Sequence, residues 1–188
     1  MSSREQVLVS QTEIFSYDNL DRLVGVSGAY SQVLSYDMLG NIESLDDAIY
    51  TYGSQPHAVT QVDTISYAYD DNGNMTTRDD QTLVWDVENR LISISDSGGT
   101  IAEFVYDGNG NRGLKTENGE TILYINQYYE KNVTTGTVTT SYYLGGRLVA
   151  EMEDEELRFI HQDSLNSTVL VTDDDGDSLG STQFYPFG

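Results

Sequence analysis

The chain of 188 residues is strongly acidic, with 9 Lys and Arg against 31 Asp and Glu, a net charge of −22 and no cysteine. This charge repels nucleic acid and anionic lipid, so neither is expected as a partner, and the lack of cysteine excludes disulfides and thiolate chemistry. No apolar run approaches the roughly 20 residues of a membrane span, and residues 1–10 lack the apolar core of a signal peptide.

A short unit recurs along the chain: an aromatic residue, Asp, two or three small or polar residues, Gly or Asn, and then an apolar pair. The aromatic residue is expected to end a strand, and Asp starts a turn by accepting a hydrogen bond from the backbone two residues on. Gly or Asn supplies the positive φ of the turn, and the apolar residue begins the return strand. Five copies begin at Tyr17-Asp18, Tyr36-Asp37, Tyr69-Asp70, Trp85-Asp86 and Tyr106-Asp107.

The copies follow one another at spacings of 16 to 21 residues, except for 33 residues between Tyr36 and Tyr69. A spacing of nearly double length predicts a diverged copy or an insertion, and Thr51–Ala58 lies in that gap. A degenerate copy, which lacks the aspartate, begins at Tyr143.

Other segments between the copies also predict hairpins. Asn118-Gly119 is a two-residue turn signal between two strand-like segments, and the acidic run Glu151–Glu156 favours a charged hairpin tip over a helical turn. Few segments hold a helical period, so we expect an all-β array of hairpins forming a coiled or solenoidal sheet, in which each repeat contacts its neighbours. We divide the chain into a lead-in strand at 1–16, a repeat array at 17–157 and a C-terminal segment at 158–188.

The repeated units resemble the tyrosine-aspartate (YD) repeats of Rhs proteins, teneurins and the C subunits of insecticidal toxin complexes. The segment 158–188 resembles the Rhs-associated core, on the strength of Arg158–Thr168, Val171–Asp177 and Phe184–Gly188. The resemblance implies a long β-sheet strip that coils into a hollow shell. In bacteria such shells often enclose a C-terminal toxin, and in animals the same shell serves as a cell-surface adhesion scaffold.

In some family members the core cuts itself with aspartates, for which Asp163 and Asp173 are the candidates here. The chain departs from the core motif, because Ser164 replaces a His, Asn166 a Gly and Val169 an Arg. Tyr185 also stands where the family has an Asp beside the proline. Aspartyl chemistry needs two carboxylates that share a proton, so we expect no catalytic residue and no enzymatic activity.

Several residues suggest other chemistry, each beside a plainer reading. His57 and His161, the only histidines, are too few for a histidine metal site and are read as turn-holding residues. Asp173, Asp175 and Asp177 form a calcium candidate, with ordinary turns as the alternative; no other cofactor is expected. Asn74, Asn132 and Asn166 begin glycosylation sequons, which matter only in an exported protein.

Three functions are consistent with these patterns. The first is a non-catalytic extracellular or cell-surface scaffold, acting as a shell segment or as a filament-like subunit that pairs with copies of itself through open sheet edges. The second is the self-cleaving core of a precursor that encloses a toxin. The third is an adhesion module that binds a cell-surface glycan or a protein, although the recurrence of tyrosine at one repeat position favours stacked structural rungs.

Overall fold

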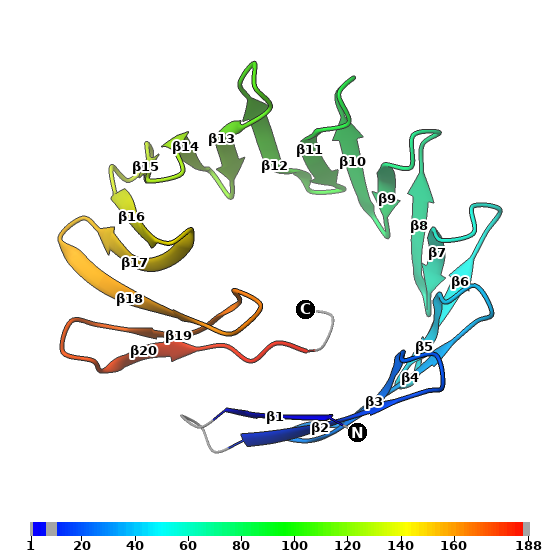
Figure 1. Ribbon diagram of the computed structural model, residues 1–188. Helices are drawn as coiled ribbons and strands as arrows, with labels where there is room; N and C mark the ends of the chain where they lie inside the picture. Colours follow the sequence, from blue (N-terminus) through cyan, green and yellow to red (C-terminus); the bar gives the residue numbers. More distant parts are fainter. Residues whose placement is uncertain (1, 7–10, 186–188) are drawn as a thin grey trace. The chain divides into compact units, whose positions relative to one another are not determined.

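The computed structural model describes residues 2–6 and 11–185, and every regular element in these ranges is a β-strand (Figure 1). The chain divides into two compact units, Met1–Arg90 and Leu91–Gly188. The all-β hairpin array expected from the sequence is therefore confirmed. No helix in the described ranges is long and apolar enough to cross a membrane.

The first unit is an antiparallel meander in which each strand pairs with the next one in sequence. Its strands are β1 (Ser2–Gln6), β2 (Gln11–Tyr17), β3 (Leu23–Gly28), β4 (Gln32–Tyr36), β5 (Ile42–Leu45), β6 (Ala48–Tyr52), β7 (Val59–Val62), β8 (Ile65–Tyr69), β9 (Met75–Arg78) and β10 (Gln81–Trp85).

The second unit repeats this plan of sequential antiparallel pairing. Its strands are β11 (Leu91–Asp96), β12 (Gly99–Tyr106), β13 (Arg112–Glu117), β14 (Glu120–Asn126), β15 (Tyr129–Asn132), β16 (Val138–Leu144), β17 (Arg147–Glu153), β18 (Glu156–Gln162), β19 (Thr168–Thr172) and β20 (Ser178–Ser181). The boundary drawn from the sequence between residues 157 and 158 lies within β18, which pairs with β17 in one hairpin.

The hairpin tips agree with their sequence signals. Asn118 and Gly119 both have positive φ, 52° and 81°, as a tight two-residue hairpin turn requires. The acidic run is a hairpin tip between β17 and β18, with Asp154 at φ 52°. The degenerate copy at Tyr143 lacks a long turn, because Gly145 and Gly146, both at positive φ, connect β16 to β17 directly.

Burial is shallow in both units. Among the described residues the buried hydrophobic side chains are Leu23, Val26, Leu34, Ala102 and Ala150. Leu23, Val26 and Leu34 form one cluster, against which half-buried neighbours such as Tyr36 pack. With so little buried apolar surface, the strands depend heavily on hydrogen bonds between neighbouring hairpins.

A ladder of aspartate turns and aromatic rungs

The repeated unit folds into one turn geometry, which we call the aspartate turn: five residues from the Asp to a closing residue four positions later. In the turn 37–41, Asp37 Oδ1 accepts the backbone N–H groups of Leu39 and Asn41, at 2.8 and 2.9 Å. The Asp37 N–H donates to the Asn41 carbonyl, and the Gly40 N–H donates to the Asp37 carbonyl. Gly40 has φ +88°, a conformation in which glycine carries no steric penalty.

The same backbone bonds occur in seven turns of the described chain, two more than the sequence pattern predicted. They span 18–22, 37–41, 70–74, 86–90, 107–111, 163–167 and 173–177. The sequence pattern did not count the last two as copies of the repeat, because Gln162 and Thr172 stand where the other copies have an aromatic residue. The segment assigned to the Rhs-associated core therefore continues the repeat geometry of the preceding array.

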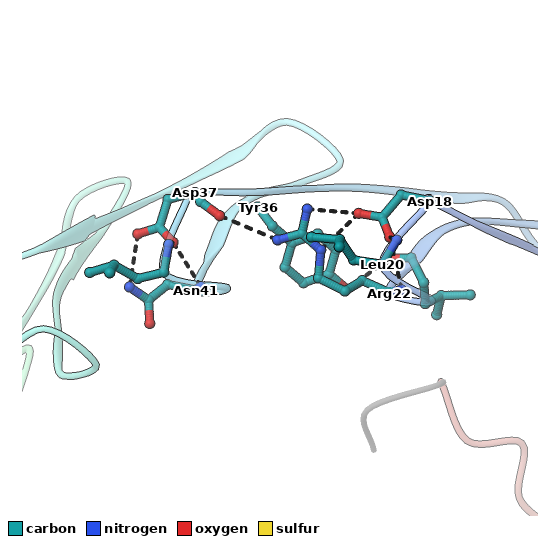
Figure 2. Close-up of polar contacts among 8 residues, drawn as sticks. Asp18, Leu20, Arg22, Tyr36, Asp37 and Asn41 are labelled. Carbon is teal, nitrogen blue, oxygen red and sulfur yellow. Dashed lines mark hydrogen bonds and ion pairs between the residues drawn. The ribbon is translucent and has the colours of Figure 1, made fainter.

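The closing residue gives the turn a second lock. Figure 2 shows the Arg22 Nε and Asn41 Nδ2 groups donating to the Oδ2 atoms of Asp18 and Asp37, at 2.7 and 2.8 Å. Asn74, Arg90 and Asn111 close their turns in the same way. Each of these aspartates thus accepts hydrogen bonds on both carboxylate oxygens from its own turn.

Several closing residues also bond to the next turn along the chain, so neighbouring repeats are linked at their tips. Arg22 donates to the Asp37 carbonyl at 3.3 Å, as Figure 2 shows, and Asn41 donates to the Pro56 carbonyl at 2.8 Å. Asn74 reaches Asn89 Oδ1 at 2.8 Å. In the second unit Arg147, from the degenerate copy, donates to the Asp163 carbonyl at 2.7 Å, so that copy keeps its link to the next repeat.

The aromatic residues form rungs between repeats. The Tyr36 hydroxyl donates to the carbonyl of Leu23, the first residue after the preceding turn, at 2.7 Å. Three further rungs donate equivalently to the residue after an earlier turn: Tyr52 to Ile42, Trp85 Nε1 to Met75, and Tyr106 to Leu91. The Arg22 guanidinium also lies 4.8 Å from the centre of the Tyr36 ring, within the range of a cation–π contact.

Tyr52 resolves the long gap in the repeat spacing. It occupies the rung position, and Gly53 stands in place of the aspartate, so the segment Thr51–Ala58 is a diverged copy. Including Tyr52, the rungs of the first unit follow one another at 16 to 19 residues. The loop that replaces the aspartate turn is held from the preceding repeat, because Asn41 bonds both Pro56 and His57.

A second set of aspartates, for which the sequence analysis predicted no role, occupies the tight two-residue turns at the strand ends opposite the aspartate turns. Asp46 has φ 50°; its N–H donates to the Val33 carbonyl, and its Oδ1 accepts the Val33 N–H, each at 2.8 Å. Asp63 makes this pair of bonds with Ile49, and Asp154 makes it with Val138. Each carboxylate thus extends the hydrogen bonding of two paired strands by one residue beyond their backbone pairing.

The hydrogen bonds of the aspartate turns perturb the acidity of the groups involved. The pKa values of five turn aspartates lie below the usual value, because the closing residue and the turn N–H groups donate to the ionised form. Burial raises the pKa of the rung tyrosines Tyr36, Tyr52 and Tyr69. The charged aspartate and the neutral tyrosine are thus the forms that the fold favours.

A family model described as teneurin YD-shell matches residues 3–188. The chain belongs to the teneurin YD-shell family. The family resemblance drawn from the repeated units is thereby confirmed, and the aspartate turns and aromatic rungs are the form that the YD repeat takes in this chain.

Two curated relatives are bacterial. The chain is 29% identical over 191 residues to the tRNA3(Ser)-specific nuclease WapA of Bacillus spizizenii, and 28% identical over 191 residues to the tRNA nuclease WapA of Bacillus subtilis strain 168. Each alignment covers 92% of the chain but only 8% of the relative. The chain therefore spans less than a tenth of the length of these relatives.

Solved structures of toxin complexes share the fold. The complex TcdB2-TccC3-Cdc42 matches with a TM-score of 0.50 and 16% identity, over 95% of this chain and 15% of that one. TcdB2-TccC3-TEV matches with a TM-score of 0.50 and 14% identity, over 99% of this chain and 14% of that one. Family and fold together support a structural shell role.

Within this YD-shell fold, the catalytic candidates Asp163 and Asp173 lie in different turns. Asp163 follows the end of β18 and Asp173 follows the end of β19, and these two strands are antiparallel. The two turns therefore lie at opposite ends of the hairpin, separated by the length of β19, about 13 Å. Each Oδ1 atom accepts two N–H groups of its own turn. The arrangement does not bring the two carboxylates together to share a proton.

Calcium binding at Asp173, Asp175 and Asp177 stays a prediction. Asp173 Oδ1 accepts the N–H groups of Asp175 and Asp177, at 3.2 and 2.8 Å, within an ordinary aspartate turn. Among the described residues no group of three or more His, Cys, Asp or Glu side chains is placed to hold a metal ion. The two histidines lie in different units, His57 bonded to Asn41 and His161 to Thr172.

The sequons occupy different surroundings, and their glycosylation stays a prediction. Asn74 Nδ2 donates to Asp70 and Asn89, so a glycan there would disturb two turns. Asn132 Nδ2 donates to Glu120 at 2.9 Å. Asn166 lies in an exposed aspartate turn at φ 68°. Tyr185, which replaces the aspartate of the core motif, is exposed. The residues after it, 186–188, lie outside the described residues.

The rungs give a first testable expectation. Changing Tyr36 to Phe removes the donor to the Leu23 carbonyl while keeping the ring, and should lower the free energy of unfolding by about 1–2 kcal/mol. Urea unfolding followed by the fluorescence of Trp85, the one tryptophan of the chain, measures this in the first unit. Tyr50→Phe is the control, since the Tyr50 hydroxyl donates to no described residue. Equal losses in the two variants would contradict the rung.

Proposed function

We propose that this chain is a non-catalytic wall segment of a larger, extracellular or cell-surface YD-repeat shell. The observation that carries the proposal is the structural use of the side chains that recur in the repeats: the turn aspartates accept hydrogen bonds from their own turns, and the rung side chains donate to neighbouring repeats. The side chains that recur most regularly are engaged in holding one hairpin to the next, as a wall requires.

The comparisons support the larger shell. Both curated relatives are roughly an order of magnitude longer than the stretch they share with this chain, and both are named as tRNA nucleases. We therefore propose that the shell encloses a toxic domain carried elsewhere in the same polypeptide. Enclosure, rather than polymerisation into filaments, is the arrangement that these relatives favour.

The test is the intact mass of the protein isolated from its source, with peptide mapping of both ends and electron microscopy of the particle. We expect this sequence inside a far longer polypeptide that forms hollow particles. We also expect proteolysis of intact particles to spare a domain that opened particles lose. A mature protein of only this length that assembles into filaments would overturn the proposal in favour of a self-assembling subunit.

A further inference from the structure

The chain contains three Asn-Gly pairs, and the fold places them in two different kinds of turn. Asn72-Gly73 and Asn109-Gly110 lie inside aspartate turns, whereas Asn118-Gly119 is the two-residue tip between β13 and β14. An asparagine followed by glycine is chemically prone to lose its side-chain amide, because the missing Cβ leaves the glycine nitrogen open to reach the asparagine side chain. The three pairs share this chemistry and differ only in their surroundings.

We propose that Asn118 is a site of spontaneous deamidation, at which the hairpin tip ages into a mixture of aspartate and isoaspartate. The backbone nitrogen of Gly119 loses its proton to solvent base and attacks Asn118 Cγ. A C–N bond forms, the Cγ–Nδ2 bond breaks, and ammonia leaves with a solvent proton. Water then opens the resulting five-membered imide at either carbonyl, so the products are aspartate or isoaspartate, and no oxidant or cofactor takes part.

The hydrogen bonding of the attacking glycine nitrogen decides which of the three pairs reacts. The Gly73 and Gly110 N–H groups each donate to the carbonyl of the turn aspartate, at 3.1 Å. Within the described chain no group accepts the Gly119 N–H, and residues 118–120 are exposed. An amide whose proton is held by a carbonyl must break that bond before it can attack, so the two aspartate turns protect their asparagines and the tight turn does not.

The hydrogen bonds of the side-chain amide, whose nitrogen is the leaving group, support the same order of reaction. Asn72 Nδ2 donates to Asn89 Oδ1 at 3.1 Å, and the Asn72 N–H is held by Asp70 Oδ1 at 2.9 Å. Asn109 has its N–H held by Asp107 at 2.8 Å, but its side-chain amide donates to no described residue. The order of reaction should therefore be Asn118 first, Asn109 second and Asn72 last.

The products would change the hairpin in two ways. Either product adds a carboxylate between Glu117 and Glu120, which already face each other across the end of the β13–β14 pair. Isoaspartate also inserts a carbon into the backbone of a two-residue turn, in which both positions now have positive φ. Such a tip no longer matches the tight turn that sets the register of the two strands.

The experiment is to incubate the purified chain in mildly alkaline buffer and to follow the three peptides by mass spectrometry. The readout is the gain of about one dalton when NH2 becomes OH, together with fragmentation that distinguishes isoaspartate. We expect Asn118 to react on the order of fivefold faster than Asn109, the factor that one net hydrogen bond supplies, and Asn72 to be slowest. Equal rates, or a faster reaction at either of the other pairs, would overturn the proposal.

Two controls separate structure from sequence. In concentrated urea the three rates should converge, because the turns that protect Gly73 and Gly110 are lost; if the folded-state order persisted unchanged, sequence rather than structure would set it. Asn118→Gly, which keeps a residue suited to positive φ, should abolish the mass gain in that peptide. Asp70→Ala should accelerate Asn72 and leave Asn118 unchanged, and a lack of acceleration would contradict protection by the turn.

Discussion

Replacing Asn41 with alanine is expected to destabilise the first unit by about 3 kcal/mol, the largest effect of any single closing residue. Asn41 is 9% exposed, and its amide nitrogen donates to Asp37 Oδ2 and to the Pro56 carbonyl, each at 2.8 Å. Asn41 Oδ1 can only accept, so His57 Nδ1–H is the donor in the 2.7 Å contact between them.

The variant would remove all three bonds and leave the Pro56 carbonyl without that donor. It would also free the diverged loop, which has no aspartate of its own and depends on Asn41 for its attachment. Urea unfolding followed by Trp85 fluorescence reports the loss. Asn72→Ala in the same unit is the matched control, since Asn72 is exposed and its side chain makes one bond; we expect a change within about 0.5 kcal/mol. Similar losses in both variants would show that the buried contacts of Asn41 with the diverged loop contribute no more than one exposed bond between turns.

The aspartate turn could be predicted from sequence because its bonds are local. Asp37 binds residues two and four positions ahead, so the residue types and their spacing carry the whole geometry. The two C-terminal turns show that the aspartate and the positive-φ residue suffice without the aromatic residue: Asn166 has φ 68° and Gly176 has φ 87°. A search for the aspartate and that residue alone would have found them.

The sequence pattern could not predict the hydrogen bonds between repeats, because their partners lie far apart in sequence. Asn41 and Pro56 are 15 residues apart, and Val33 and Asp46 are 13 residues apart. Nothing local distinguishes Asp46 from a solvated surface aspartate. Its role depends on β5 pairing with β4, which places it beside the Val33 backbone. Asp46, Asp63 and Asp154 are thus acceptors that hold two neighbouring strands together, a role that no local pattern predicts.

Acid is expected to destabilise the sheet once the pH falls below about 4, where the turn aspartates begin to bind protons on unfolding. The five turn aspartates with lowered pKa values bind protons less readily when folded than when unfolded. Their contribution to stability is thus complete above about 3.9, the usual pKa of Asp. It is lost progressively as pH falls below that value toward the folded pKa values. Urea midpoints measured from neutral pH downward should fall steeply in this range.

A comparison of Asp70 with Asp71 tests whether the turn hydrogen bonds cause the loss of stability in acid. Asp70 holds a turn, with its pKa lowered first by the side-chain hydrogen bond from Asn74 and then by backbone donors. The carboxylate of Asp71 accepts no hydrogen bond from a described residue. Both Asp70→Asn and Asp71→Asn remove one negative charge, but only the first removes a carboxylate that accepts hydrogen bonds from its own turn. Asp70→Asn should therefore weaken the acid dependence of the urea midpoint, whereas Asp71→Asn should leave its slope unchanged. If the two variants flattened the dependence equally, net charge rather than the turns would govern acid stability.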